Sequence, residues 1–145
     1  MKIIALSRSE AKQFVYERPW VAISIDSFEG EHPKINAVQR VALLQLSYGD
    51  IDHDMGPNHG KLFDKDDANK VWDFLEQYWD KIELVMVHCM AGVSRSAATA
   101  AAIDQCMNGG NGNDFYGGRY HPNNHVLRTL RDTYYERQAN DEVQS

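Results

Sequence analysis

One cysteine and one arginine stand six positions apart, where an apolar run gives way to an alanine-rich segment. Cys89 follows the run Leu84–Val87, and Arg95 opens the alanine-rich segment. The residues between them are small or compact: Met90, Ala91, Gly92, Val93 and Ser94. Such a loop can curl with its N–H groups inward and form an anion nest at the start of the next helix. The planar guanidinium of Arg95 suits two phosphoryl oxygens, so residues 89–95, here called the phosphate cradle, predict a phosphoryl site with a thiolate at its base.

The pattern His88-Cys89-x5-Arg95-Ser96 resembles the signature of the cysteine-dependent protein tyrosine phosphatases, and its Ala-Gly-x-x-Arg-Ser ending is most similar to the dual-specificity branch. The resemblance implies hydrolysis of phosphate monoesters through a phosphocysteine, with Cys89 as the nucleophile. Arg95 and the N–H groups of residues 90–95 would then hold the phosphoryl oxygens. His88 would orient the loop by hydrogen bonding to its backbone, and Ser96 would stabilise the sulfur when it leaves in the second step.

Three aspartates follow the apolar run Val41–Leu46 and are candidates for a general acid. A departing tyrosine oxygen needs a proton, and ligands bind at the strand ends of open α/β sheets. In the phosphatases that this chain resembles, the acid lies on a mobile loop some thirty-odd residues before the cysteine. Asp50, Asp52 and Asp54 lie 39, 37 and 35 positions before Cys89. The spacing between strand and acid in those phosphatases implies Asp50, with Asp52 next, and the choice stays open.

Asp26, His53 and His59 are not expected to take part in catalysis or metal binding. Asp26 also follows an apolar run, but it lies far upstream of the cradle and is interpreted as a loop residue. His53 and His59 lie among the acids, yet their spacing matches no structural zinc pattern. Because phosphoryl transfer by a cysteine needs no metal, we expect neither a metal nor another cofactor.

Strand and helix patterns alternate along the chain. The expected strands are Lys2–Leu6, Val21–Ile25, Val41–Leu46 and Leu84–Val87. The expected helices run from Ser7 or Ser9 to about Tyr16, from a cap at Asp64 to about Trp79, and from Ser94 to about Met107. This alternation predicts a three-layer α/β fold: a mostly parallel central sheet flanked by helices, with the phosphate-binding loop between the central strand and a helix.

A second resemblance lies near the C-terminal end. The stretch Pro122-Asn123-x-x-Val126-x-x-x-Leu130 is similar to the segment that opens the final helix of dual-specificity phosphatases. Val126 stands where those proteins usually have Phe, and Thr129 stands where they usually have Gln. The resemblance therefore implies the helix but no polar role for position 129. The family likeness covers about residues 41–136.

Length and composition narrow the function classes. The 145 residues predict a single domain, 1–145, with a polar tail at about 140–145. Apolar content of 43% and the lack of an apolar run of about 20 residues predict a cytoplasmic protein without a membrane partner. Two cysteines argue against a disulfide framework. The net charge of −6 makes nucleic-acid binding unexpected.

The expected function is that of a protein tyrosine or dual-specificity phosphatase acting on a phosphorylated protein or peptide. Phosphoinositide and RNA 5′-triphosphate phosphatases share the cradle, but their loops often carry extra basic side chains, which Met90, Ala91, Val93 and Ser94 do not supply. A rhodanese-type sulfurtransferase also uses a cysteine in a six-residue loop, but the Gly-Val-Ser-Arg-Ser ending fits phosphate better. The non-enzyme alternative is an inactive phosphotyrosine-binding module, although the cradle lacks nothing essential.

Overall fold

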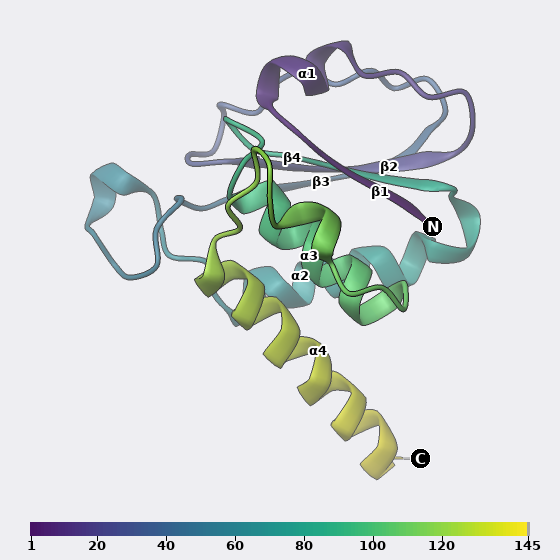
Figure 1. The fold of residues 1–145 in the computed structure, drawn as a ribbon, viewed down its shortest axis with the longest axis vertical. Helices are drawn as coiled ribbons and strands as arrows, with labels where there is room; N and C mark the ends of the chain where they lie inside the picture. Colours follow the sequence, from purple (N-terminus) through teal and green to yellow (C-terminus); the bar gives the residue numbers. More distant parts are fainter. Residues whose placement is uncertain (145) are drawn as a thin grey trace.

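A sheet of parallel strands forms the centre of the computed structural model, which describes residues 1–144. The strands are β1 (Lys2–Leu6), β2 (Trp20–Asp26), β3 (Arg40–Ser47) and β4 (Leu84–His88). They lie in the order β1-β4-β2-β3, and every neighbouring pair is parallel (Figure 1). The interior position predicted for the strand before the cradle is confirmed. Because the strands are parallel, their carboxyl ends meet at one edge of the sheet.

Helices cover both faces of this sheet, as the sequence predicts. The helices are α1 (Arg8–Gln13), α2 (Lys65–Tyr78), α3 (Arg95–Met107) and α4 (Asn124–Gln144), with short 3-10 helices at Pro57–His59, Trp79–Lys81 and Asn113–Phe115. Figure 1 shows α1 on one face and α2, α3 and α4 on the other. The three-layer α/β prediction is confirmed, although one of its outer layers is much thinner. Within residues 1–144, no helix is both long and apolar enough to cross a membrane.

The central strands are apolar on both faces because both faces are covered. In β2, Val21, Ile23 and Ile25 join the core beneath α2, α3 and α4, whereas Trp20 and Ala22 join the smaller core beneath α1. This division follows from the two-residue period of a strand, which sends successive side chains to opposite faces. A strand buried on both sides therefore reads as a continuous apolar run.

The first helix is shorter than the sequence predicts. It begins at a capping box, in which Ser7 Oγ accepts a hydrogen bond from the Glu10 N–H at 3.2 Å and Glu10 Oε1 accepts one from the Ser7 N–H at 2.9 Å. The predicted end at Tyr16 is wrong, because the helix stops at Gln13 and Phe14 is extended. The ring of Phe14 packs edge-on against Trp20 with centroids 4.9 Å apart. Aromatic packing against the sheet thus replaces a further helical turn.

The helices on the thicker side pack through small side chains and one indole. In α3 the residues from Ala97 to Ile103 are all buried, and their mostly one-carbon side chains allow the helix to approach the sheet closely. Trp72 of α2 is fully buried, and its Nε1 donates a hydrogen bond to the carbonyl of Leu130 in α4 at 3.0 Å. This hydrogen bond joins α2 to α4.

The segment between β3 and α2 includes a loop, residues 50–59, that projects from the body (Figure 1). Its two ends meet where the Gly49 N–H donates to the Lys61 carbonyl at 2.8 Å. A Cβ atom at Gly49 would lie 2.0 Å from the carbonyl oxygen of His59. Only glycine therefore permits this close approach of two backbones, which fixes the base of the projecting loop.

We expect Gly49→Ala to lower the free energy of unfolding by about 1–3 kcal/mol, because the added methyl must push the His59 backbone away. Urea unfolding followed by circular dichroism measures this change. Gly117→Ala is the matched control, since a Cβ at Gly117 has no neighbour within 4 Å. Equal midpoints for the two variants would contradict the tight packing at Gly49.

Candidate active site

The cradle begins where the central strand ends. Cys89 directly follows β4 and is buried, and its N–H donates to the Leu6 carbonyl at 3.3 Å. Its Sγ lies 3.2 Å from the Ser96 Oγ, in the first turn of α3. The Ser96 hydroxyl, to which the sequence assigned stabilisation of the sulfur, is therefore in hydrogen-bond contact with it.

The cradle folds against the segment that follows β1. Gly92 has a positive φ of 72°, and a Cβ there would lie 2.4 Å from the Ser7 backbone nitrogen. The Arg8 N–H donates to the carbonyl of Met90 at 3.1 Å. Glycine is thus required both by the left-handed backbone and by contact with a neighbouring chain segment. The packing fixes the curvature that the cradle needs.

Arg95 is buried with only 5% of its surface exposed. Its Nη1 donates to the Ser27 Oγ at 3.1 Å and to the Tyr48 carbonyl at 2.8 Å, which ties the guanidinium to the ends of β2 and β3. Its Nε is also buried but has no hydrogen-bond partner among the described residues. A buried cationic donor without a partner is costly, so this side of the guanidinium is suited to an anion.

The three candidate acids have different surroundings. Asp50 Oδ1 accepts hydrogen bonds from the cradle hydroxyl of Ser94 at 2.8 Å and from the Asn123 amide at 2.9 Å. Asp52 is exposed and bonds to the ring of its neighbour His53 at 2.6 Å, which lowers the pKa of the Asp52 carboxyl. Asp54 accepts from the Gly56 N–H at 2.9 Å. Of the three carboxylates, Asp50 is the one that contacts the cradle.

Asn123 is a site residue that the sequence did not identify as such. Its Oδ1 accepts from the N–H groups of His125 and Val126, which caps α4, while its Nδ2 donates to Asp50. Its backbone N–H donates to the Ser94 carbonyl at 3.1 Å. One side chain therefore connects the last helix, the acid and the cradle. The Pro-Asn pattern marked the helix start, but its contact with Asp50 spans 73 positions.

Asp26 is not the loop residue that the sequence suggested. It is the last residue of β2 and is 1% exposed. Its carboxylate pairs with the Arg8 guanidinium at 3.3 Å. Because Arg8 also bonds through its backbone to Met90, this ion pair joins the end of β2 to the segment that supports the cradle. The ion pair with Arg8 compensates the cost of burying the Asp26 carboxylate.

His88 is fully buried beneath the cradle and belongs to a chain of hydrogen bonds. Its Nδ1 donates to the Cys89 carbonyl at 3.4 Å, so its Nε2 accepts from the Ser24 hydroxyl at 2.5 Å. The Ser24 oxygen also contacts His32 Nδ1 at 3.0 Å, and His32 Nε2 contacts Ser47 Oγ at 3.1 Å. Ser24 and His88 are register partners on neighbouring strands, which the sequence could not reveal.

Burial lowers the pKa of His88 to about 4. The imidazole is therefore neutral at pH 7, and it contributes a hydrogen bond rather than a positive charge. Burial also lowers the pKa of His32 in the same chain. Within residues 1–144, there is no group of three or more His, Cys, Asp or Glu side chains that could bind a metal ion.

Three solved structures are similar to this chain over nearly their whole length. PTPMT1 in complex with PI(5)P has a TM-score of 0.60 at 19% identity, covering 97% of this chain and 94% of that one. Human DUSP28 has a TM-score of 0.66 at 17% identity, covering 95% and 94%. Human tyrosine phosphatase-like serine/threonine/tyrosine-interacting protein has a TM-score of 0.63 at 21% identity, covering 94% and 92%.

At these identities the likeness concerns the fold, and it agrees with the fold that the sequence predicts. The chain has the fold of the cysteine-dependent tyrosine and dual-specificity phosphatases. No family model and no curated protein matches its sequence.

The low pKa of His88 predicts an acid-sensitive stability. Between pH 6.5 and 4 the unfolded chain binds a proton that the folded chain does not, so the free energy of unfolding falls as the pH falls. From pH 7 to pH 5, the wild type should lose about 2 kcal/mol more than His88→Gln. Urea unfolding at both pH values measures this difference. Parallel pH dependence in the two proteins would show that His88 does not titrate in this way.

Proposed function

We propose that this chain hydrolyses phosphate monoesters through a phosphocysteine intermediate. The observation that carries the proposal is the buried, unpartnered Nε of Arg95 in the same cradle as the Cys89 sulfur. That nitrogen and the N–H groups of residues 90–95 would bind the phosphoryl oxygens. The negative charge on these oxygens increases as the sulfur attacks, so the same donors would stabilise the transition state. The phosphatase fold supports the same assignment.

In the first step the Cys89 thiolate forms a bond to phosphorus while the bond between phosphorus and the leaving oxygen breaks. Asp50 gives that oxygen its proton. The hydrogen bonds from Ser94 and Asn123 both reach Oδ1 of Asp50. Oδ2 is therefore the oxygen that would carry the proton to the leaving group.

In the second step a water molecule attacks the phosphocysteine and the bond between phosphorus and sulfur breaks. The Asp50 carboxylate takes a proton from the water, and the products are inorganic phosphate and the free thiolate. Ser96 lies 3.2 Å from the sulfur and would donate a hydrogen bond to it as negative charge returns. His88 would hold the Cys89 carbonyl, and hence the direction of the loop, as a neutral donor.

The proposed substrate is a phosphorylated protein or peptide. The exposed cradle side chain Met90 is apolar, which suits a phosphoresidue on a polypeptide. A similar structure is titled as a complex with PI(5)P, which keeps a phosphoinositide as the alternative. In this chain, however, the charge of Arg8 beside the cradle is paired with Asp26. An RNA 5′-triphosphate would need further cations, and an inactive binding module would show affinity without turnover.

Turnover of a substrate panel tests the proposal: phosphotyrosine and phosphoserine peptides, phosphoinositide vesicles, and RNA 5′-triphosphate. We expect phosphotyrosine peptides to be hydrolysed with the highest kcat/KM. Cys89→Ser should lose essentially all activity and still bind the phosphopeptide, because the cradle is retained while the nucleophile is not. Activity near the wild-type level in Cys89→Ser would exclude a phosphocysteine.

The role of Asp50 predicts a dependence on the leaving group. Asp50→Asn should lower kcat for phosphotyrosine by about 10²–10⁴-fold, because that leaving oxygen is basic and needs a proton. The loss should be much smaller for a nitrophenyl ester, which can leave as an anion. Steady-state kinetics with both substrates measures the contrast.

Asp52→Asn is the matched control for this prediction. Asp52 lies on the same loop, but its carboxylate bonds to His53 rather than to the cradle. It should retain wild-type kinetics with both substrates. The leaving-group signature in Asp52→Asn instead of Asp50→Asn would move the acid two residues along the loop.

A further inference from the structure

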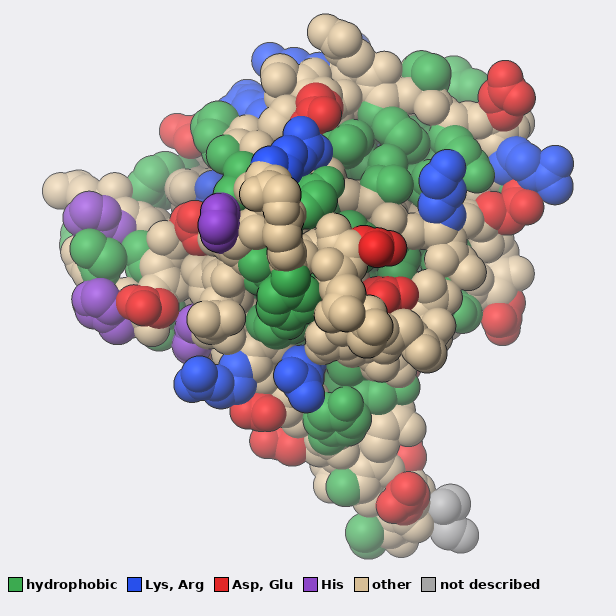
Figure 2. Space-filling view, viewed as in Figure 1, with side chains coloured by type: hydrophobic (Ala, Val, Ile, Leu, Met, Phe, Trp, Pro, Cys, Tyr) green, Lys and Arg blue, Asp and Glu red, His purple; other side chains and the backbone are tan. Residues whose placement is uncertain are grey.

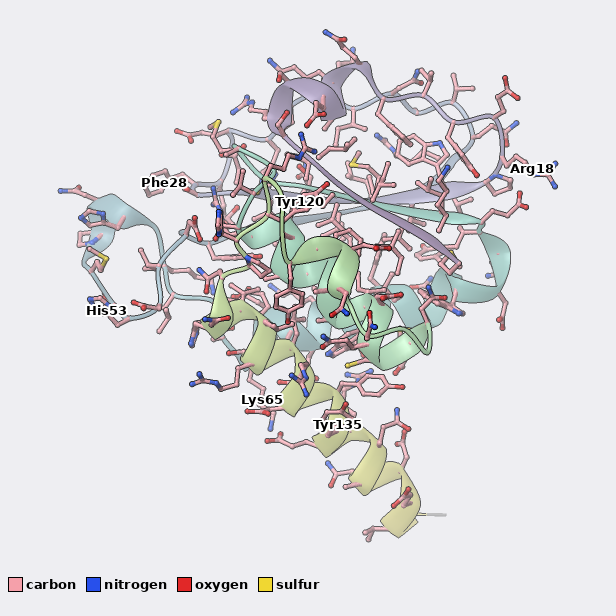
Figure 3. The ribbon with its side chains drawn as sticks, viewed as in Figure 1. Arg18, Phe28, His53, Lys65, Tyr120 and Tyr135 are labelled. Carbon is pink, nitrogen blue, oxygen red and sulfur yellow. The ribbon has the colours of Figure 1, made fainter. Side chains whose placement is uncertain are left out.

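A cavity of about 670 Å³ opens between the segment after β2 and the projecting loop. Ser27 and Phe28 line one side, and Asp54 and Pro57 line the other. The labelled side chains of Phe28 and His53 lie at the end of the molecule from which this loop projects (Figure 3). Neither proposed step of hydrolysis uses this space.

The cavity adjoins the cradle through one shared side chain. Ser27, which lines the cavity, accepts a hydrogen bond from Arg95 Nη1 at 3.1 Å. If Arg95 binds the phosphoresidue of a substrate, residues a few positions away in the substrate chain can reach the cavity, since consecutive Cα atoms lie about 3.8 Å apart. The cavity is in the correct place to bind a neighbouring side chain of the substrate.

The walls of the cavity combine apolar surface with carboxylates. Phe28, which is 40% exposed, provides apolar surface together with Pro57 and Leu62. Glu29 and Asp54 also line the cavity. A long aliphatic stem ending in a cation matches such a surface, because the stem packs on apolar groups and the cation reaches the acids.

The charges around the cavity favour a cation over an anion. Lys61 also lines the cavity, but its ammonium pairs with Asp67 and Asp64. Neither Glu29 nor Asp54 forms an ion pair within residues 1–144. Histidine side chains and an acidic one lie over the projecting loop in Figure 2, and Asp52 pairs with His53 there. The net negative charge of this wall would repel an acidic side chain.

We infer that this cavity binds an arginine side chain of the phosphopeptide substrate, within about three residues of the phosphorylated residue. The stem of that arginine packs against Phe28 and Leu62, and its guanidinium pairs with Glu29 and Asp54. The planar donor fork of arginine meets two carboxylates better than a lysine ammonium does. The inference rests on the proposed phosphatase function, whose substrate class it narrows to basic phosphopeptides.

Three phosphotyrosine peptides that differ at one nearby position, with Arg, Ala or Glu, test the inference. Wild-type kcat/KM should be about 3- to 10-fold higher for the Arg peptide than for the Glu peptide. The ratio should shrink at high salt, because these charges are partly exposed. Scanning the Arg over three positions on each side of the phosphotyrosine locates the subsite.

Charge reversal at the cavity provides the decisive comparison. Glu29→Lys should abolish or invert the preference for the Arg peptide. Glu31→Lys makes the same charge change on the same loop, but Glu31 does not line the cavity, so this variant should keep most of the preference. Equal kcat/KM for the Arg and Glu peptides in the wild type, or equal loss of preference in both variants, would overturn the inference.

A binding measurement separates failure of this inference from failure of the proposed function. Fluorescence anisotropy of the three labelled peptides with the Cys89→Ser protein reports affinity without turnover. If no phosphopeptide is hydrolysed, the proposed function fails, but a Kd ratio favouring the Arg peptide that is reversed by Glu29→Lys would still support the subsite. Equal Kd values would overturn the subsite whatever the turnover.

Discussion

The buried guanidinium of Arg95 is the group on which the rest of the site depends. Only 5% of Arg95 is exposed, so its buried charge needs hydrogen-bond partners. Ser27 and the Tyr48 carbonyl supply only some of them. Those two bonds join the first residue of α3 to the ends of β2 and β3. Without a ligand, the buried Nε lacks a hydrogen-bond partner, and a bound phosphoryl oxygen would supply one. In the proposed function, different sides of this one guanidinium would position the cradle and bind the ligand.

Asn123 extends this arrangement to the acid and to the last helix. Because its side chain caps α4 and donates to Asp50, the position of the proposed acid depends on where α4 begins. The close backbone contact of Gly49 with His59 fixes the base of the same loop, directly beside Asp50. The proposed acid is thus held by its own long-range contacts and by the packing of its neighbour Gly49, although it lies on an exposed loop. Such support is what a group that must meet a leaving oxygen requires.

Features that depend on local chain order could be predicted from the sequence, and features that depend on distant contacts could not. The strand, cradle and helix around Cys89 are contiguous, so their apolar run, compact loop and alanines indicated them directly. The family spacing favoured Asp50 among the three acids, but its contact with Ser94, 44 positions away, could not be predicted from the sequence. The bond between Ser24 and His88 depends on strand order and register. The early end of α1 at Gln13 followed from the packing of Phe14 on Trp20, which no periodicity indicates.

The neutrality of His88 determines how the charges in the site must be shared. An imidazole with a pKa of about 4 cannot balance a thiolate at neutral pH, and Arg8 is already paired with Asp26. Arg95 would then have to stabilise both the thiolate and a phosphate dianion, which together carry more negative charge than one guanidinium offsets. In the proposed mechanism the remaining stabilisation would come from dipoles: the N–H groups of the cradle, the N-terminus of α3 and the Ser96 hydroxyl. The packing of Gly92 against Ser7 would serve this role, because oriented N–H groups stabilise a charge only when the loop is held in one conformation.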